Sequence, residues 1–224
     1  MYKVKAATEI IDKREILMRS AIKLFAENGF DAVTTRMIAA DAGVNLALIS
    51  YYFNSKDGLI DAIIEERIPV FGEKLRSIQN LNINSFEKLQ LAIDAYIDRI
   101  LSSGDFAKLI YRELSLKNRS HNLEKLMEAF KKNKTLLEDI IIEGQERKEF
   151  RSDLDYKMLL LSFFSTVIML VNTTNVCAMV LNESKDNLAK EDFKYRVKTY
   201  FKQMFSQLNI VPDKIAGESV SQRV

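Results

Sequence analysis

Apolar residues recur at helical spacing along almost the whole of this 224-residue chain. Because positions i, i+3, i+4 and i+7 share one face of an α-helix, this pattern predicts an all-α protein. Helices are predicted from near Asp12 to Gly29, in two short segments within 34–53, and at about 56–79, 86–101, 106–116, 123–147, 156 into the 170s, and 190–208. Pro69 falls inside the 56–79 helix and is expected to kink or split it, because proline has no N–H to donate.

The stretch 34–56 carries the most specific pattern in the chain. Thr34 or Thr35 can cap a first short helix through its side-chain oxygen. Gly43 then stands where the chain must turn, since glycine tolerates positive φ. Ile49, on the second short helix, faces back toward the first. Such a pair can hold its second helix outward, as a helix-turn-helix does against the major groove of DNA. An ordinary αα-corner is the alternative.

The amino-acid sequence of this stretch resembles that of the TetR/AcrR family of bacterial transcriptional regulators. The motif TTRMIAADAGVNLALISYYFNSKDGL matches that family's DNA-binding domain almost position for position, and LFAENGF before it resembles the family's first helix and glycine stop. The resemblance covers about residues 13–65. It implies a three-helix helix-turn-helix DNA-binding domain at 1–58 and a helical effector-binding and dimerisation domain at 59–211. Residues 212–224 are polar, and a flexible tail is expected there.

Chemistry and the resemblance together predict which side chains contact DNA. They are Thr35, Arg36, Asn45, Leu46, Ala47, Ser50, Tyr51, Tyr52 and Lys56. Free amides at the start of the helix at Thr35 suit a phosphate, and Arg36 is long enough to reach a guanine edge. Leu46 and Ala47 are apolar, and Ser50 stands where the family often has tyrosine. Fewer direct base hydrogen bonds follow, so the operator sequence is not predictable.

The last predicted helix carries a wide apolar stripe, which consists of Phe193, Val197, Tyr200, Phe201, Met204 and Phe205. Together with the apolar helix before it, this stripe can form a four-helix bundle between two subunits. The alternative is that both helices complete the subunit's own core. A dimer is favoured, because one short reading head binds DNA weakly and two related by a twofold axis read a palindromic site. The resembled family dimerises in this way.

The resemblance also implies an effector cavity in the C-terminal domain. The candidate lining residues are Phe106, Tyr111, Phe130, Phe163, Phe164, Met169 and Asn172, which would give apolar walls with occasional polar groups. Taken singly, each of these residue types is more often plain core than pocket lining. The implied ligand is a small apolar or amphipathic molecule.

Composition narrows the functional class further. The net charge is only +2, so affinity for nucleic acid must come from local placement of charge. One histidine, His121, and one cysteine, Cys177, offer no metal-ligand spacing, and no nucleotide-binding or hydrolase motif is present. We therefore expect no enzyme activity, metal or cofactor. The most apolar run, 158–171, is about 14 residues, shorter than the roughly 20 that span a membrane. No secretory signal is visible, and a cytoplasmic location is expected.

Taken together, the sequence predicts a sequence-specific DNA-binding regulator. The favoured form is a dimeric repressor that a small-molecule effector releases from a palindromic operator. The alternative is a constitutive or protein-partner-controlled regulator that senses no small molecule.

Overall fold

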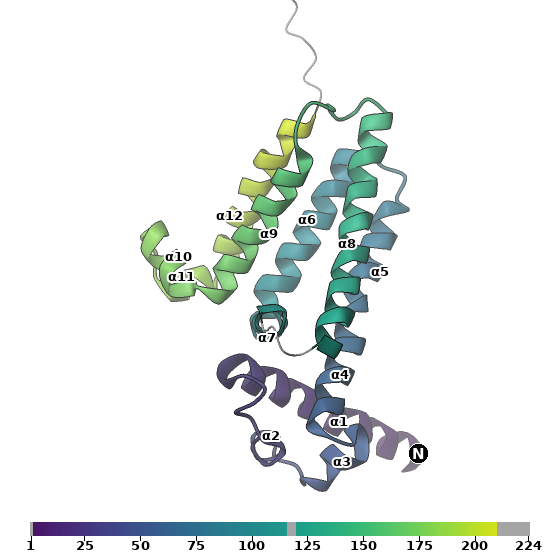
Figure 1. Ribbon diagram of the computed structural model, residues 1–224, viewed down its shortest axis with the longest axis vertical. Helices are drawn as coiled ribbons and strands as arrows, with labels where there is room; N and C mark the ends of the chain where they lie inside the picture. The colour runs from purple at the N-terminus through teal and green to yellow at the C-terminus, as the bar shows by residue number, and fades with distance from the viewer. Residues whose placement is uncertain (1, 116–119, 210–224) are drawn as a thin grey trace, which may run out of the picture.

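The computed structural model describes residues 2–115 and 120–209 of the chain. Its helices are α1 (Tyr2–Asn28), α2 (Thr35–Asp41), α3 (Ala47–Phe53), α4 (Lys56–Arg67), α5 (Pro69–Gln79), α6 (Ser85–Ser102), α7 (Gly104–Ser115), α8 (Ser120–Glu146), α9 (Tyr156–Asn172), α10 (Thr174–Leu181), α11 (Lys185–Leu188), α12 (Glu191–Phe205) and the 3₁₀ helix η1 (Ser206–Leu208). Figure 1 shows a small N-terminal head below a taller helical bundle. The all-α prediction is confirmed, and the predicted tail at 212–224 lies outside the described residues.

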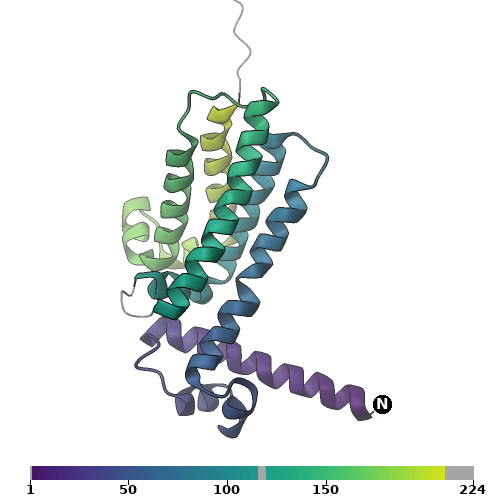
Figure 2. The same ribbon diagram turned by 45° about the vertical axis from the view of Figure 1, so that its right-hand side comes forward.

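The first helix begins earlier than the sequence pattern suggested. α1 starts at Tyr2, so Asp12 lies inside the helix and does not cap it. The physical reason is that residues 2–12 (YKVKAATEIID) contain no glycine or proline and include good helix formers such as alanine, lysine and glutamate. In Figure 2 this N-terminal part of α1 projects away from the head.

Pro69 splits the long helix predicted at 56–79 into α4 and α5. α4 ends at Arg67, and Pro69 occupies the first position of α5, where its missing N–H costs least. α4 belongs to the head and α5 runs up into the bundle (Figure 1). The break therefore marks the passage from one part of the molecule to the other.

The head has its own apolar core, built from α1–α4. Among its fully buried side chains are Leu17, Phe25, Val33, Ile38, Leu59 and Ile63. The same core takes in Leu109 and Ile110 of α7, against which α1 packs. Leu59 and Ile63 of α4, which follow the domain boundary predicted at residue 58, pack into this core. That boundary stays a prediction based on sequence.

The bundle, called the body below, consists mainly of α5, α6, α8, α9 and α12. Its core is aromatic, with the Phe163 ring 4.8 Å from that of Phe201 and 5.2 Å from that of Tyr96, measured between centroids. The structure corrects the predicted dimer stripe on α12. Phe193, Val197, Phe201 and Phe205 are all buried in the subunit's own core, and Met204 is half-buried against it. Tyr200, with 58% exposed, reaches the surface. Helical spacing identifies an apolar face without saying which partner covers it.

Two short helices that the sequence analysis did not predict follow α9. The chain turns by 106° between α9 and α10, and α10 and α11 stand out to one side of the bundle in Figure 1. Cys177 of α10 is buried, and its Sγ lies 3.4 Å from the Met169 carbonyl oxygen. In the described part of the chain, no single helix is long and apolar enough to cross a membrane. Only the bent α9–α10 pair reaches that length and composition.

Candidate nucleic-acid interface and effector cavity

The corner between α2 and α3 is held by short local hydrogen bonds. Thr34 caps α2, since its Oγ1 accepts from the Met37 N–H at 3.2 Å. Gly43 turns the chain at φ +64°, a conformation in which a residue with a Cβ would be strained. Asn45 then accepts the Ala47 N–H at 2.8 Å and opens α3. This fixed corner determines how α3 is presented.

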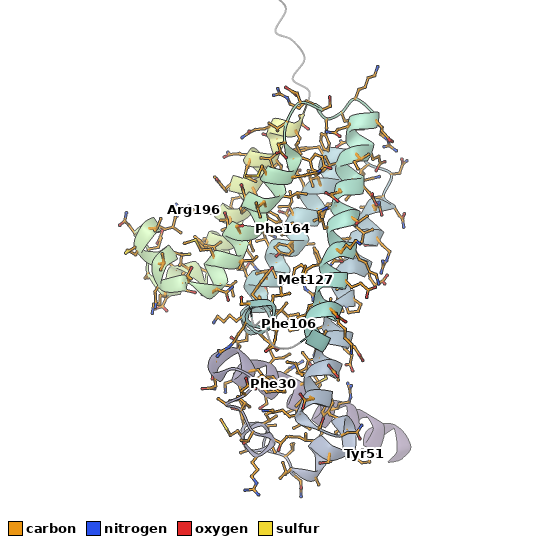
Figure 3. The ribbon with its side chains drawn as sticks, in the orientation of Figure 1. Phe30, Tyr51, Phe106, Met127, Phe164 and Arg196 are labelled. Atoms are coloured by element: carbon orange, nitrogen blue, oxygen red, sulfur yellow. The ribbon has the colours of Figure 1, made fainter. Side chains whose placement is uncertain are left out.

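The outward side of α3 is exposed, as a groove-reading helix requires. Ile49 and Phe53 are buried beneath α3, whereas Tyr51 is 75% exposed and points away from the head at its lower edge in Figure 3. The exposed residues of the predicted DNA-contacting set are Arg36, Asn45, Leu46, Ala47, Ser50 and Tyr51; Thr35, Tyr52 and Lys56 are half-buried. The Tyr52 ring packs edge-on between those of Tyr51 and Phe53. The predicted contacts thus gather on one end of the molecule.

Lys56 has a structural role that sequence reasoning missed. Its Nζ donates to the backbone carbonyls of Phe30 and Val33, at 2.9 Å each, and lies 4.3 Å from the centroid of the Phe30 ring. These contacts join the start of α4 to the loop between α1 and α2. An ammonium group has three N–H donors, so one remains for a phosphate oxygen. No sequence motif signals the two carbonyl contacts, because they depend on how the loop folds back.

The α3–α4 turn is as tightly built as the α2–α3 corner. Asn54 adopts φ +64°, and the Ser55 hydroxyl caps α4 by accepting from the Gly58 N–H at 3.0 Å. A Cβ added at Gly58 would lie 2.0 Å from the Phe53 carbonyl oxygen. Glycine is therefore required here for the close approach of α4 to the end of α3.

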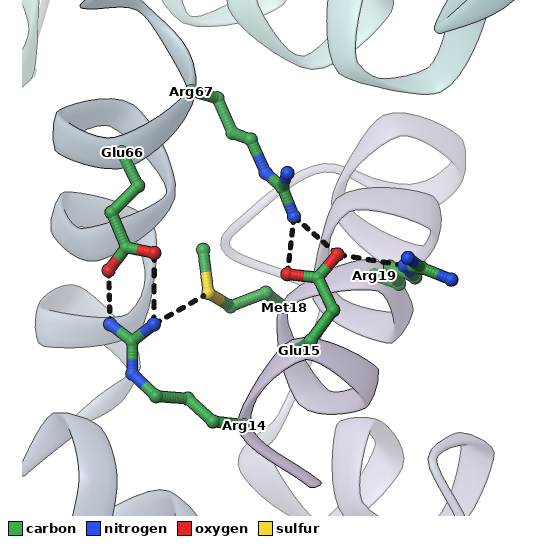
Figure 4. A network of polar contacts seen from close by, with 6 residues as sticks. All are labelled: Arg14, Glu15, Met18, Arg19, Glu66 and Arg67. Atoms are coloured by element: carbon green, nitrogen blue, oxygen red, sulfur yellow. Dashed lines mark hydrogen bonds and ion pairs between the residues drawn. The ribbon is translucent and has the colours of Figure 1, made fainter. Parts of the chain in front are cut away.

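Ion pairs tie α1 to the far end of α4 (Figure 4). Both nitrogens of the Arg14 guanidinium fork donate to the Glu66 carboxylate, and this hydrogen bonding lowers the pKa of Glu66. Glu15 accepts from Arg67, and from Arg19 at 2.8 Å. Burial alone would raise the pKa of Glu15, but the two arginines outweigh it, and the pKa is lowered. The reading head is thus fastened to the segment that leads into the body.

The body contains an apolar cavity of about 810 Å³, here called the body cavity. It lies between α5, α6, α7, α8 and α9, and its apolar lining includes Phe71, Tyr96, Tyr111, Leu114, Phe130, Leu137 and Phe164. This volume is within the usual range for small-molecule sites. Figure 3 shows Phe164 within the bundle and Met127, another lining residue, on α8.

The structure sorts the predicted effector residues into three groups. Tyr111, Phe130 and Phe164 line the body cavity, and Phe106 lines a smaller space of about 50 Å³ that adjoins it. Phe163 is instead fully buried core, and Met169 lines a separate groove between α9, α10 and α12. Asn172 is exposed at the end of α9. The last three are corrections, because a residue type gives no indication of which side of its helix faces an opening.

Two hydrogen-bonded phenols are among the polar groups that line both the adjoining space and the body cavity. The Tyr96 and Tyr111 oxygens lie 2.6 Å apart, a hydrogen-bond distance, and both residues line the two spaces. Burial raises the pKa of both phenols, so each keeps its proton at neutral pH. One proton is shared between the two oxygens, which leaves the other O–H to donate to a bound molecule or water. Sequence analysis did not identify Tyr96 or Phe71, whose helices carry no ligand-binding signature.

An exposed α3 above a fixed corner, joined to a helical body with a cavity, defines a helix-turn-helix regulator with a sensing domain. Comparison with family models agrees. The model described as bacterial regulatory proteins, tetR family, matches residues 17–63. The model described as tetracyclin repressor-like, C-terminal domain, matches residues 82–172. The chain belongs to the TetR family of transcriptional regulators and is a DNA-binding protein of that family.

Individual relatives point the same way. The chain is 29% identical over 175 residues to the fatty acid metabolism regulator protein of Bacillus subtilis (strain 168), covering 77% of this chain and 86% of that protein. Among solved structures, the ketosteroid transcriptional regulator KstR2 of Mycobacterium tuberculosis has a TM-score of 0.69 at 20% identity, covering 88% of this chain and 95% of that one. FadR from Bacillus subtilis in complex with stearoyl-CoA has a TM-score of 0.63 at 23% identity, covering 85% and 98%. At these identities the structural likeness shows the fold.

Proposed function

We propose that this protein is a dimeric repressor whose operator binding is ended by an amphipathic effector in the body cavity. The observation that carries the proposal is the cavity itself. It has a volume of about 810 Å³ and mostly apolar walls, and it lies in the body, on which the reading head is mounted. A ligand with a long acyl chain fits such walls. Support for this class of ligand comes from the relatives, one named for fatty acid metabolism and one solved with stearoyl-CoA.

Helix α7 provides a physical connection between the cavity and the head. Tyr111 and Leu114 line the cavity, whereas Leu109 and Ile110 of the same helix belong to the core of the head. A ligand that fits one placement of α7 better than another would change the populations of head positions. Release of DNA follows when the favoured placement mismatches the two half-sites. The same helix therefore carries both ligand contacts and support for the head.

We place the dimer interface on the outward sides of α9 and α12. Leu161 and Tyr200 are 57% and 58% exposed, and Met169 is 43% exposed. Ser162, Ser165 and Thr166 lie on the same exposed side of α9, and such small side chains allow a second helix to approach closely. A twofold axis through this face would give two reading heads at a fixed separation, which suits a palindromic operator. A cytoplasmic location follows from DNA as the partner.

A DNA-binding titration tests the effector proposal. Fluorescence anisotropy with a labelled palindrome from upstream of the gene would measure affinity with and without fatty acids, acyl-CoA thioesters, sterols and aromatic acids. We expect at least one long-chain compound to weaken operator binding by tenfold or more. Undiminished binding across the panel would favour the alternative, a constitutive or partner-controlled regulator. If the protein bound the operator and random DNA with equal affinity at raised salt, operator recognition itself would be contradicted.

A further inference from the structure

Arg99 of α6 holds an unusual position where the head joins the body. Its Nη2 donates to the Arg67 backbone carbonyl at 2.5 Å, at the end of α4. Its guanidinium carbon lies 5.8 Å from the centroid of the Phe71 ring and 5.6 Å from that of Phe106. Burial, and then repulsion from Arg67, lowers the pKa of Arg99, although arginine stays charged. A partly desolvated cation of this kind gains from any anion that reaches it.

The charges around Arg99 are already paired with one another. A pocket of about 530 Å³, called the junction pocket, is lined by Arg99 and by Arg19, Lys23, Arg67, Glu15 and Asp105. Glu15 accepts from Arg67 and Arg19, Lys23 pairs with Asp41 at 2.8 Å, and Asp105 lies 3.8 Å from Lys108. Within residues 13–115 and 124–209, whose side chains are described, no carboxylate pairs with Arg99. Among the cations that line this pocket, Arg99 is therefore the one that no carboxylate of the described side chains contacts.

Three neighbouring spaces share lining residues from Arg99 to the body cavity. Arg99 and Phe106 line both the junction pocket and the small adjoining space. That space shares Phe71, Tyr96 and Tyr111 with the body cavity. A molecule lying along this series would meet a cation at one end, phenolic donors in the middle and apolar walls at the other end.

From this arrangement we infer that the effector is a long-chain anion whose head group binds Arg99 while its chain passes Tyr96 and Tyr111 into the body cavity. The inference rests on the proposed effector function and adds the chemical class and orientation of the ligand. A carboxylate and a phosphate both satisfy the guanidinium fork, so a free fatty acid and an acyl-CoA thioester share the required chemistry. Binding there also competes for the guanidinium that holds the Arg67 carbonyl, which places the ligand at the α4–α5 break.

The opposite orientation makes a different prediction. Lys131 and Lys134, on exposed turns of α8, line the body cavity but not the adjoining space. Lys134 pairs with Glu138 at 2.6 Å. If a head group lay at this end, removing the two lysine charges would weaken binding of an anion, and replacing Arg99 would leave it unchanged. Variants at the two ends therefore separate the orientations.

Calorimetric titration of the full-length protein with palmitate, palmitoyl-CoA and the neutral hexadecanol tests the inference. We expect the wild type to bind at least one anion more tightly than hexadecanol by roughly tenfold to a hundredfold, the range of one charge-assisted hydrogen bond. Arg99→Gln should remove that preference while keeping hexadecanol affinity, and Arg99→Lys should restore part of it. The Lys131→Gln/Lys134→Gln variant should retain the preference. The anion whose tighter binding is lost in Arg99→Gln shows whether the ligand is a free fatty acid or an acyl-CoA thioester.

Each contrary result has a distinct meaning. Equal affinity of the wild type for hexadecanol and both anions would overturn the inference and leave the effector proposal standing. Loss of preference in the lysine variant alone would overturn the orientation. If none of the three compounds binds the wild type, the long-chain effector proposal fails and this inference fails with it. Thermal melting of Arg99→Gln checks its fold, and Arg99→Lys with the wild-type comparison keeps the test decisive if that variant unfolds.

Discussion

At the scale of single residues, Lys56 combines two roles that can be measured apart. Lys56→Ala removes two charge-assisted hydrogen bonds to the Phe30 and Val33 carbonyls, so we expect unfolding to become easier by about 2 kcal/mol. We also expect weaker binding to all DNA sequences, with the salt slope lower by about one unit. Calorimetry reports the first effect and anisotropy across a salt series the second.

The exposed Lys74→Ala on α5 is the matched control for Lys56→Ala, since it removes the same charge at a position far from the α1–α2 loop. It should change neither stability nor salt slope. An unchanged melting temperature for Lys56→Ala would mean that the loop contacts contribute little. An unchanged salt dependence of DNA affinity in Lys56→Ala would mean that the ammonium group does not contact the phosphates, whatever the effect on stability.

At the scale of elements, the α1–α4 ion pairs should respond to pH with a definite sign. Arg14 lowers the pKa of Glu66 in the folded protein, so the pair stabilises the fold above the ordinary glutamate value of 4.5 and loses that contribution as the pH falls through the lowered pKa. Glu66→Gln should therefore lower the melting temperature at pH 7 and lose its effect in acid. Because Glu66 is 45% exposed, we expect less than about 1 kcal/mol.

Melting curves of wild type and Glu66→Gln between pH 7 and pH 3 measure this difference. Glu146→Gln, at an exposed position on α8, is the control for loss of one carboxylate. A Glu66→Gln effect that stays constant down to pH 3 would show that the ion pair is not its source. A variant more stable than wild type at pH 7 would show that Glu66 is not held in a favourable pair.

Elements also show what could be predicted from the sequence and what could not. Helix positions, the Thr34 cap and the split at Pro69 depend on local chemistry, and the structure agrees with each. The start of α1 and the existence of α10 were missed, because charged or polar residues at 2–12 and 172–175 do not themselves end or prevent a helix. The outward side of α3 was predicted correctly because its family motif fixes the whole corner.

Contacts between distant elements were harder to predict. Phe163 and Phe201 were expected at a cavity and an interface, yet their rings meet in one core. The Lys56 carbonyl contacts and the position of Arg99 depend on how loops and helix ends meet in space. Periodicity indicates which side of a helix is apolar, and tertiary packing decides whether core, ligand or partner covers it.

At the scale of the whole molecule, the proposed dimer on α9 and α12 predicts that one surface charge disables operator binding. Leu161 is 57% exposed on α9, so Leu161→Glu should leave the subunit fold intact while placing a charge where the twofold-related copy would pack. We expect sedimentation velocity to show a monomer. Operator affinity should fall by far more than tenfold, because the two heads no longer bind as one unit.

Ile142→Glu is the matched control, because Ile142 is 41% exposed on α8, a helix that packs against α5, α6 and α7 and carries no part of the proposed interface. It should remain dimeric with normal operator affinity. A Leu161→Glu protein that stays dimeric would show that the interface lies elsewhere. Met179→Glu, at a position of α10 that is 70% exposed, would then test another apolar surface. A monomeric Leu161→Glu with unchanged affinity would mean that one head suffices. The twofold reading of the operator would then be wrong, although α3 could still be the element that enters the groove.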